Sequence, residues 1–383
     1  MCIASLFYLP AHADPALHPS IFDIERGLNV MTIRATYWLR GILLAALAAV
    51  PLVGCATADP AGKTQQTQSQ AGSAAGETVR KEKVTVNIGV QGKTGILPYA
   101  REKGYFEKAF AKVGAEVKWN EFASGPPHFE ALAAGRLDFG ATGGTPLISG
   151  QTGGVDFRAI AVTADGRKGN MIVIPKNSPI KELKDLKGKK IAVAKGSSAY
   201  NFLYMAIDKA GLKGNDIKEI QLQPDEARPA LDTGAIDAWS IWEPYATTAV
   251  FQTGATILVS GENLNINAPS FLVARTKFTK DYPDLTVLFL KTYEEARSYY
   301  ASHQDEVTDD LVKSQKLDKA IIGQVLKNTD PITSPTTPEF AKAHQEQADF
   351  LLSVGAINKK LDTSQVIDNK FVEQALDEIK KGK

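Results

Sequence analysis

Cysteine and histidine are scarce in this sequence of 383 residues. The two cysteines are Cys2 and Cys55, and the five histidines do not stand at the spacing of metal ligands. A disulfide-rich scaffold and a cysteine-ligated metal site are therefore excluded. The net charge is only +1, so no excess of basic residues indicates binding to nucleic acid. We expect no metal, no cofactor and no nucleic-acid partner.

Three common catalytic and nucleotide-binding signatures are also missing. The sequence contains no Gly-x-Ser-x-Gly, no P-loop and no His-Glu-x-x-His. These absences argue against a hydrolase with a nucleophile elbow, a P-loop nucleotidase and a zinc protease of that class. We therefore expect a binding protein without catalytic residues rather than an enzyme.

A single long apolar run occurs, at residues 42–53. It is too short to span a membrane comfortably. Arg34 and Arg40 precede it, and Gly54 and Cys55 follow it, which is the order of a secretory signal with a small residue before its cleavage site. The segment resembles the bacterial lipoprotein signal, and that resemblance implies lipidation of Cys55. A short core helix that ends by chance at a cysteine is the alternative.

The chain before the folded part divides into three segments. Residues 1–30 carry acidic side chains that do not suit the positive start of a signal, so we expect translation to begin at Met31. Residues 31–54 are then the signal peptide. Residues 55–82 are rich in Ala, Gly, Thr, Gln and Ser, which predicts a flexible tether. The folded domain is expected to start at Lys83.

From residue 84 onward, short apolar runs alternate with helical patterns. This alternation is typical of a parallel sheet covered by helices. Ligands of such sheets bind outside the carboxyl ends of the strands, where three Gly-rich loops with polar residues are expected. These loops are residues 91–95, 123–125 and 142–145. One helix is predicted over 97–111, and another is predicted to start with Thr145 as its N-cap and Pro146 as its first residue.

The alternation repeats in a second block, so we predict an α/β fold of two lobes. Lobe 1 is expected to comprise residues 83–170 and 271–383, and lobe 2 residues 171–270. The prediction is of two sheets with mostly parallel strands, joined by two crossing segments, with the C-terminal helices on lobe 1. Such a hinged clamshell closes around a ligand held between its lobes.

One stretch of lobe 2 has the pattern of an anion site. An apolar strand at 191–194 is followed by the turn Gly196, Ser197 and Ser198, and then by a helical pattern. A helix N-terminus presents unpaired backbone N–H groups and a positive dipole end to an anion. An ordinary serine N-cap that binds nothing is the alternative.

Four segments, at 121–126, 135–143, 195–201 and 237–245, resemble the aliphatic-sulfonate-binding proteins of ABC importers, within the wider nitrate/sulfonate/taurine group. The resemblance implies a periplasmic-binding-protein clamshell of type II. It also implies a small organic anion as ligand, an ABC permease as partner, and a location in the periplasm or at the outer face of the cell membrane. This chain has Gly144 where those proteins carry an acidic residue, which suggests a wider cleft or one polar contact fewer.

A sulfonate needs hydrogen-bond donors around it, and neutral donors suffice. The residues predicted to bind it lie in the Gly-rich loops and near the cleft wall. They are Gln91, Gly92, Ser124, Thr142, Gly143, Gly196, Ser197, Ser198, Asn201, Trp242 and Glu243. Trp242 is expected to cover an alkyl chain or to pack in the core. Glu243 is expected to bond a ligand ammonium, or else a helix end or solvent. His128 is expected either at the cleft or at the surface, and Trp239 in the core.

The sequence thus predicts a monomeric lipoprotein that captures an aliphatic sulfonate and delivers it to a permease. Taurine or nitrate could occupy the same site. A lipoprotein that senses a solute without transporting it is a second hypothesis. An enzyme similar to the thiamine-pyrimidine synthases is a third, but those enzymes carry a cysteine cluster that this chain lacks.

Overall fold

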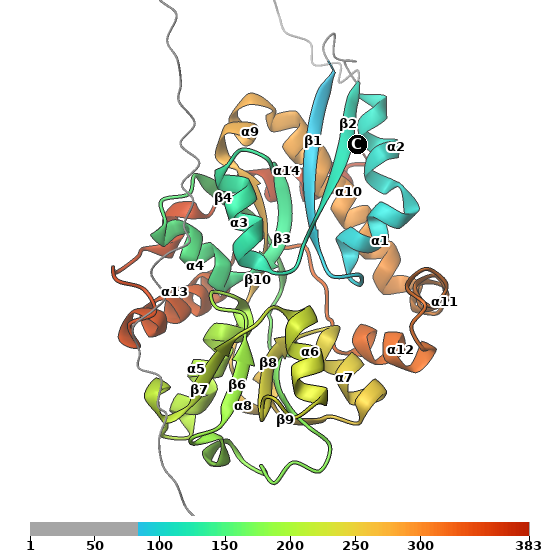
Figure 1. Cartoon of the computed structure of the whole chain (residues 1–383). Coiled ribbons are helices and arrows are strands. Elements are labelled where there is room, and N and C mark those ends of the chain that lie inside the picture. The colour runs from blue at the N-terminus through green and yellow to red at the C-terminus, as the bar shows by residue number, and fades with distance from the viewer. Residues whose placement is uncertain (1–82, 383) are drawn as a thin grey trace, which may run out of the picture. The chain divides into compact units, whose positions relative to one another are not determined.

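The computed structural model describes residues 83–382, which form two α/β lobes (Figure 1). The signal peptide, the tether and Cys55 lie outside the described residues. Lobe 1 is built on the sheet β2-β1-β3-β10-β4, and lobe 2 on the sheet β7-β6-β8-β5-β9. The strands are β1 Val84–Gln91, β2 Ala115–Phe122, β3 Phe139–Gly143, β4 Phe157–Ala164, β5 Asn170–Ile174, β6 Lys190–Val193, β7 Lys218–Gln221, β8 Ala238–Trp242, β9 Thr256–Ser260 and β10 Ser270–Arg275.

Helices cover both sheets. They are α1 Ile96–Lys103, α2 Tyr105–Lys112, α3 Gly125–Ala133, α4 Gly144–Thr152, α5 Ser198–Lys209, α6 Pro224–Asp232, α7 Tyr245–Thr253, α8 Gly261–Leu264, α9 Thr276–Asp281, α10 Pro283–Ser302, α11 Gln304–Gln315, α12 Lys319–Lys327, α13 Pro338–Ser353 and α14 Lys370–Lys380.

The two sheets have the same internal plan. In lobe 1 the strands β2, β1 and β3 are parallel, and β10 is antiparallel to both β3 and β4. In lobe 2 the strands β7, β6 and β8 are parallel, and β5 is antiparallel to both β8 and β9. The antiparallel strands β5 and β10 are those that the chain enters directly after crossing between the lobes. The predicted two-lobed α/β fold is therefore confirmed.

The two crossing segments run side by side. The backbone N–H of Ala268 donates to the carbonyl oxygen of Asp165 at 3.1 Å. Gly166 has a φ of 77°, and a Cβ at this position would lie 1.7 Å from the Ala268 carbonyl oxygen. Only glycine meets both demands. This contact holds the two crossing segments together at Gly166 and Ala268.

Two local predictions were wrong. The helix expected over 97–111 is divided at Gly104, which has a φ of 69° and ends α1 in a left-handed turn. The helix expected to be capped by Thr145 begins earlier, with Gly143 as its N-cap. The reason is that β3 stays paired with β10 as far as Gly143, and Gly144 then donates its backbone N–H to Pro269.

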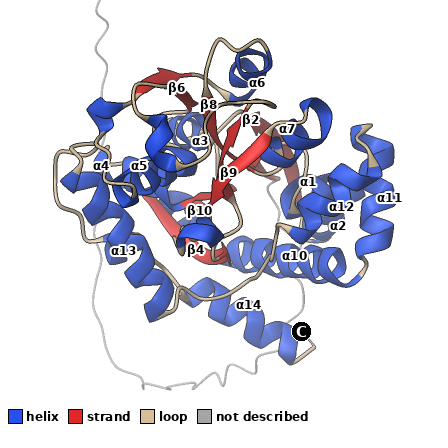
Figure 2. Cartoon of the chain, turned by 90° about the horizontal axis from the view of Figure 1, so that it is seen from below, coloured by secondary structure: helices blue, strands red, loops and turns tan. Residues whose placement is uncertain are grey.

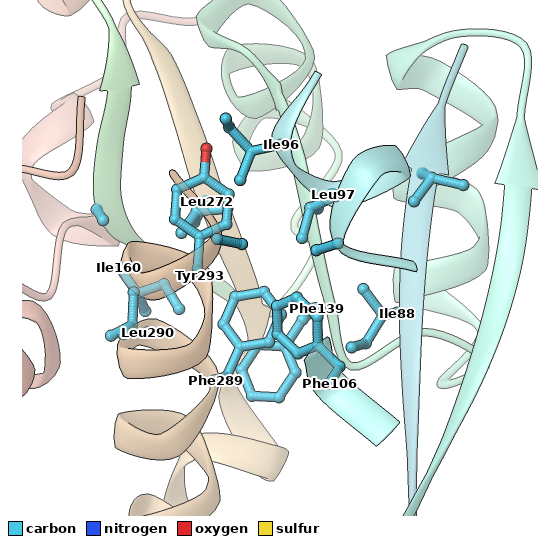
Figure 3. Close-up of a cluster of buried hydrophobic side chains, with 14 of the residues drawn as sticks. Ile88, Ile96, Leu97, Phe106, Phe139, Ile160, Leu272, Phe289, Leu290 and Tyr293 are labelled. Carbon is cyan, nitrogen blue, oxygen red and sulfur yellow. The ribbon is translucent and has the colours of Figure 1, made fainter. Parts of the chain in front are cut away.

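The core of lobe 1 lies between its sheet and α10 (Figure 3). Phe139 on β3 stacks on Phe289 on α10, with ring centroids 4.2 Å apart, and Phe106 on α2 packs against Phe289 at 5.1 Å. Burial of each such ring contributes roughly 1.5–3 kcal/mol. Tyr293 lies further along α10 and, with Ile96, reaches the space between the lobes. The packing of this core therefore fixes one wall of that space.

The C-terminal helices do more than cover lobe 1. Helices α10 and α14 pack together on lobe 1, as expected, but α12 contacts α7 of lobe 2. Helix α13 contacts both α4 of lobe 1 and α5 of lobe 2 (Figure 2). The segment from α12 to α13 thus links the lobes in addition to the two crossing segments.

Replacing Asp138 by asparagine is expected to lower the free energy of unfolding by about 3–5 kcal/mol. The Asp138 side chain is buried and accepts hydrogen bonds from Arg275 of β10, at 2.5 and 3.1 Å. It also accepts from the backbone and side-chain nitrogens of Asn87 of β1, at 2.9 and 3.0 Å. An amide there cannot accept all four bonds, and it leaves the Arg275 charge without its partner. Urea unfolding measures the effect.

The matched control for this variant is Asp281→Asn. Asp281 forms an exposed ion pair with Lys277 at 2.6 Å. Both residues belong to α9 and are four positions apart, which is about one helical turn. Exposed pairs of this kind contribute less than about 1 kcal/mol. Equal losses in the two variants would show that Asp138 does not tie β1 to β10.

Candidate functional site

A cleft of about 280 Å³ lies between the two lobes. This volume is close to the lower limit of small-molecule pockets and suits a small ligand. Lobe 1 contributes Thr142 and Gly143 to its wall, and lobe 2 contributes Ser198. The lobes approach closely there, because a Cβ added to Gly143 would lie 2.8 Å from the Cβ of Ser198.

Four helices begin at the wall of this cleft. Helix α1 is preceded by Gly95, α3 starts at Gly125, α4 is preceded by Gly143, and α5 is preceded by Ser197; all four residues line the cleft. Each helix directly follows the carboxyl end of a parallel strand, so their N-termini meet at the facing edges of the two sheets. Their dipoles and remaining N–H groups together create a positive potential. Prolines in the first turns of α1, α3 and α4 carry no N–H, and the N–H of Gly144 is already bonded to Pro269.

The serine turn of lobe 2 serves as a helix cap and also borders the cleft. Ser197 is the N-cap of α5, and its hydroxyl accepts from the backbone N–H of Tyr200 at 3.3 Å. The hydroxyl hydrogen of Ser197 is not needed for this bond. The alternative of an ordinary serine cap therefore holds as well, and it does not conflict with a ligand contact.

Asn170, the first residue of β5, is positioned by this turn. The Ser198 hydroxyl donates to Oδ1 of Asn170 at 2.9 Å, which leaves the Asn170 amide nitrogen as a hydrogen-bond donor. Asn170 is 4% exposed and lines the cleft. This residue was missed because the sequence pattern places the start of the strand at Met171.

The predicted residues fall into two groups. Those that line the cleft are Gln91, Thr142, Gly143, Ser197, Ser198, Trp242 and Glu243. Those that do not are Gly92, Ser124, Gly196 and Asn201. Ser124 and Asn201 are buried behind the wall, and the Ser124 hydroxyl and Oδ1 of Asn201 have no protein partner. Gly92 faces Pro244 of the other lobe, and Gly196 faces Pro126.

Aromatic side chains line the other end of the cleft. Trp242 of lobe 2 lines it and packs edge-on against Tyr245 at 5.9 Å. Tyr293 and Tyr300, both on α10 of lobe 1, also line it. These rings offer an apolar surface to an organic group. The neighbouring Trp239 is 1% exposed and belongs to the core, as predicted.

Glu243 bonds a helix end, which is one of the roles predicted for it. Its carboxylate accepts from the backbone N–H and the hydroxyl of Thr247, at 3.2 and 2.8 Å, in the first turn of α7. It also accepts from the side-chain amide of Asn328, at 2.6 Å, in the segment that follows α12. Burial raises the pKa of Glu243, and these hydrogen bonds partly oppose that rise.

Positive charge plays little part in the cleft. Among the described residues that line the cleft, Lys168 is the one basic residue. Its ammonium group forms an ion pair with the carboxylate of Asp330 at 2.7 Å. The lining also contains Asp165, which pairs with Arg167 at 2.8 Å. An anion in this cleft would therefore be held by neutral donors and helix N-termini.

His128 lies neither at the surface nor at the cleft wall, so both expectations for it were wrong. It is fully buried, stacked on Phe122 at 5.1 Å, and burial lowers its pKa to about 4. A Cβ at Gly140 would lie 2.0 Å from the His128 ring. The ring therefore fits here only because residue 140 has no side chain. The local sequence pattern gives no sign of this long-range fit.

The absence of a side chain at Gly144 has a different effect from the one expected. A Cβ at this position would lie 2.9 Å from Nδ1 of His344 and 2.9 Å from Oε1 of Gln347, both on α13. The side chain would point toward α13 and not into the cleft. Gly144 therefore does not widen the cleft, but leaves space for two buried polar side chains.

A search of residues 83–382 finds no cluster of three or more His, Cys, Asp or Glu side chains that could hold a metal ion. In the same part of the chain, no helix is both long enough and apolar enough to cross a membrane.

Comparison with known proteins places the chain in a family. The profile of the NMT1-like family matches residues 80–314. An aliphatic sulfonates-binding protein of Bacillus subtilis (strain 168) is 47% identical over 302 residues, which cover 79% of this chain and 91% of that protein. Its counterpart in Escherichia coli (strain K12) is 35% identical over 284 residues, which cover 74% of this chain and 88% of that protein.

Two solved structures share the fold. The alkanesulfonate-binding protein SsuA from Xanthomonas axonopodis pv. citri, bound to MOPS, aligns with a TM-score of 0.71 at 27% identity and covers 76% of this chain and 100% of its own. The periplasmic aliphatic sulphonate binding protein SsuA from Escherichia coli aligns with a TM-score of 0.66 at 33% identity and covers 76% of this chain and 99% of its own. The resemblance indicated by the four sequence segments is confirmed, and the chain belongs to the NMT1-like family.

Proposed function

We propose that the protein binds an aliphatic sulfonate in the cleft between its lobes and delivers it to an ABC permease. The observation that carries this proposal is the meeting of four helix N-termini with Ser, Thr and Asn side chains in a cleft without an unpaired cation. A sulfonate remains ionised at physiological pH and accepts hydrogen bonds through three oxygens. It needs donors on several sides, which the hydroxyl and amide groups of the lining supply together with the dipoles and remaining N–H groups at the N-termini of α3, α4 and α5.

The aromatic end of the cleft accounts for the organic part of the ligand. Trp242, Tyr293 and Tyr300 can cover an alkyl chain, while the sulfonate lies near Thr142 and Ser198. The names of the Bacillus subtilis and Escherichia coli relatives support this ligand class. The periplasmic SsuA of Escherichia coli, which shares the fold at 33% identity, supports an exported protein with a binding role.

Three further features belong to the same proposal. The chain acts as a monomer, Cys55 carries the lipid anchor, and residues 55–82 tether the folded domain outside the cell membrane. The proposed bounds are residues 83–170 and 271–383 for lobe 1 and residues 171–270 for lobe 2, except that Asn170 begins β5 in the sheet of lobe 2 and Ser270 begins β10 in the sheet of lobe 1. Closure of the lobes over the ligand gives the permease a surface that differs between the loaded and empty forms.

A panel of anions tests the proposed ligand class. Binding to the folded state raises its free energy of unfolding by RT ln(1 + [L]/Kd), about 2.7 kcal/mol at a hundredfold excess over Kd. Ethanesulfonate and longer alkanesulfonates are expected to raise the melting temperature, and nitrate and sulfate to raise it less. Thermal unfolding with each ligand measures the shifts. A shift with neutral or cationic solutes but with none of the anions would contradict the proposal.

Taurine is a second candidate ligand because of Glu243. This carboxylate lines the cleft, and its described partners are the neutral residues Asn328 and Thr247 rather than a cation. The ammonium of an aminosulfonate could supply the missing charge. If taurine shifts the melting temperature more than ethanesulfonate does, and Glu243→Gln removes the difference, taurine is the better ligand.

A further inference from the structure

Gln91 at the cleft wall and the buried His128 behind it form a hydrogen-bonded pair next to Thr142, where the sulfonate is proposed to bind. Gln91 is the last residue of β1 and lines the cleft, whereas His128 lies on α3 and is fully buried. Nε2 of Gln91 lies 3.2 Å from Nδ1 of His128. The same nitrogen donates to the carbonyl oxygen of Ala141 at 3.0 Å. Ala141 precedes Thr142, so the pair adjoins the predicted sulfonate position.

The orientation of the Gln91 amide follows from these two partners. A carbonyl oxygen only accepts hydrogen bonds, so the amide end that faces Ala141 must be the nitrogen. This nitrogen carries two hydrogens, and the second one points to His128. Nδ1 of His128 can accept it only when that ring nitrogen carries no proton.

The surroundings of His128 keep the ring in this form. Its described neighbours are Phe122, Phe129 and Leu137 and the backbone of Gly89 and Gly140, none of which is charged. Burial lowers the pKa of His128 to about 4, so the ring is neutral at physiological pH, with its proton on Nε2. That nitrogen is buried and has no protein partner.

We propose that His128 is a positioning residue that holds the Gln91 amide with its oxygen toward the cleft, and that the site therefore favours sulfonates that carry a hydrogen-bond donor near the head group. Both amide hydrogens of Gln91 are used inside the protein, so the oxygen is the group left for the ligand. This oxygen accepts from a hydroxyl or amine and repels sulfonate oxygens. The sequence suggested that Gln91 donates to the anion. In this proposal Gln91 instead accepts from the group of the ligand next to the sulfonate. The inference rests on the proposed function.

A pair of ligands with the same head group tests this selectivity. Ethanesulfonate and 2-hydroxyethanesulfonate differ by one hydroxyl, and calorimetric titration gives the Kd of each. The preference is the Kd of ethanesulfonate divided by that of 2-hydroxyethanesulfonate. In His128→Leu and in Gln91→Leu the preference is expected to fall about 3- to 10-fold, which corresponds to one neutral hydrogen bond.

The double variant separates positioning from a structural role. If His128 acts through Gln91, adding His128→Leu to Gln91→Leu lowers the preference no further. His128→Asn keeps an acceptor oxygen near the position of Nδ1 and is expected to keep most of the preference. An unchanged preference in the single variants, or additive losses in the double variant, overturns the inference while sulfonate binding stands. Failure of both ligands to bind the parent protein overturns the proposed function itself and, with it, this inference.

Nuclear magnetic resonance tests the pair without any ligand. In protein labelled with ¹⁵N at histidine, His128 is expected to show a proton on Nε2 and none on Nδ1 at pH 7. A proton on Nδ1 would overturn the inference, because Gln91 could then not donate to this nitrogen.

Discussion

Replacing Ser198 and Asn170 together by alanine is expected to raise the Kd for an alkanesulfonate about 10- to 100-fold. The Asn170 amide nitrogen is a donor aimed by the Ser198 hydroxyl, which bonds Oδ1 at 2.9 Å. A hydrogen bond to a charged group contributes roughly 1.5–3 kcal/mol, and the double variant removes the Asn170 amide donor together with the Ser198 hydroxyl that orients it. Calorimetric titration with ethanesulfonate measures the loss.

The fold should tolerate this double variant. Ser198 and Asn170 are partners of each other, so removing both leaves neither with an unsatisfied buried group. The matched control is Ser260→Ala. Ser260 is the N-cap of α8, accepts from the backbone N–H of Asn263 at 3.2 Å, and does not line the cleft. Its loss is expected to cost about 1 kcal/mol of stability and leave the Kd unchanged. Equal effects of both variants on Kd would contradict the predicted site.

Acid is expected to destabilise the folded protein through His128 and His344. Burial alone lowers the pKa of each to about 4, from a usual value of 6.5. Above pH 6.5 neither state binds protons there. As the pH falls from 6.5 to 4, the unfolded chain takes up both protons and the folded chain resists them, so the free energy of unfolding falls. Each histidine is expected to remove about 3 kcal/mol by pH 4.

Urea unfolding at a series of pH values measures this effect. His344→Leu is expected to reduce the slope of the free energy of unfolding against pH, between pH 6.5 and 4, by up to about 1.4 kcal/mol per pH unit. Neither ring nitrogen of His344 has a hydrogen-bond partner in the protein. Replacing the ring by leucine therefore breaks no hydrogen bond and leaves no neighbouring polar group unsatisfied. His128→Leu should flatten the curve likewise. Parallel curves for the parent protein and both variants would show that the buried rings are not responsible.

The fold could be predicted from the sequence because its signals are local. The apolar runs that became β1 and β6 are followed by glycine-rich turns and helical patterns. Strand, turn and helix in that order specify where the loops emerge on a parallel sheet. For this reason Thr142, Gly143, Ser197 and Ser198 could be assigned to the facing edges of the two lobes.

The remaining part of the cleft depends on long-range packing that no local pattern encodes. Tyr293 and Tyr300 belong to the buried face of α10, and their sequence pattern is that of ordinary core residues. Asn328 lies at the start of an irregular, Pro/Thr-rich segment, and only the fold brings it to Glu243. His128 fits its site because Gly89 and Gly140 come together there from two different strands.

A crystal structure of the protein with ethanesulfonate is the most direct test of the central claim that neutral donors at helix N-termini hold the anion. We expect the sulfonate within hydrogen-bond distance of Asn170 and Ser197, between the N-termini of α4 and α5, with its ethyl group toward Trp242. A sulfonate bound instead to Lys168 in place of Asp330, or outside the cleft, would contradict the claim.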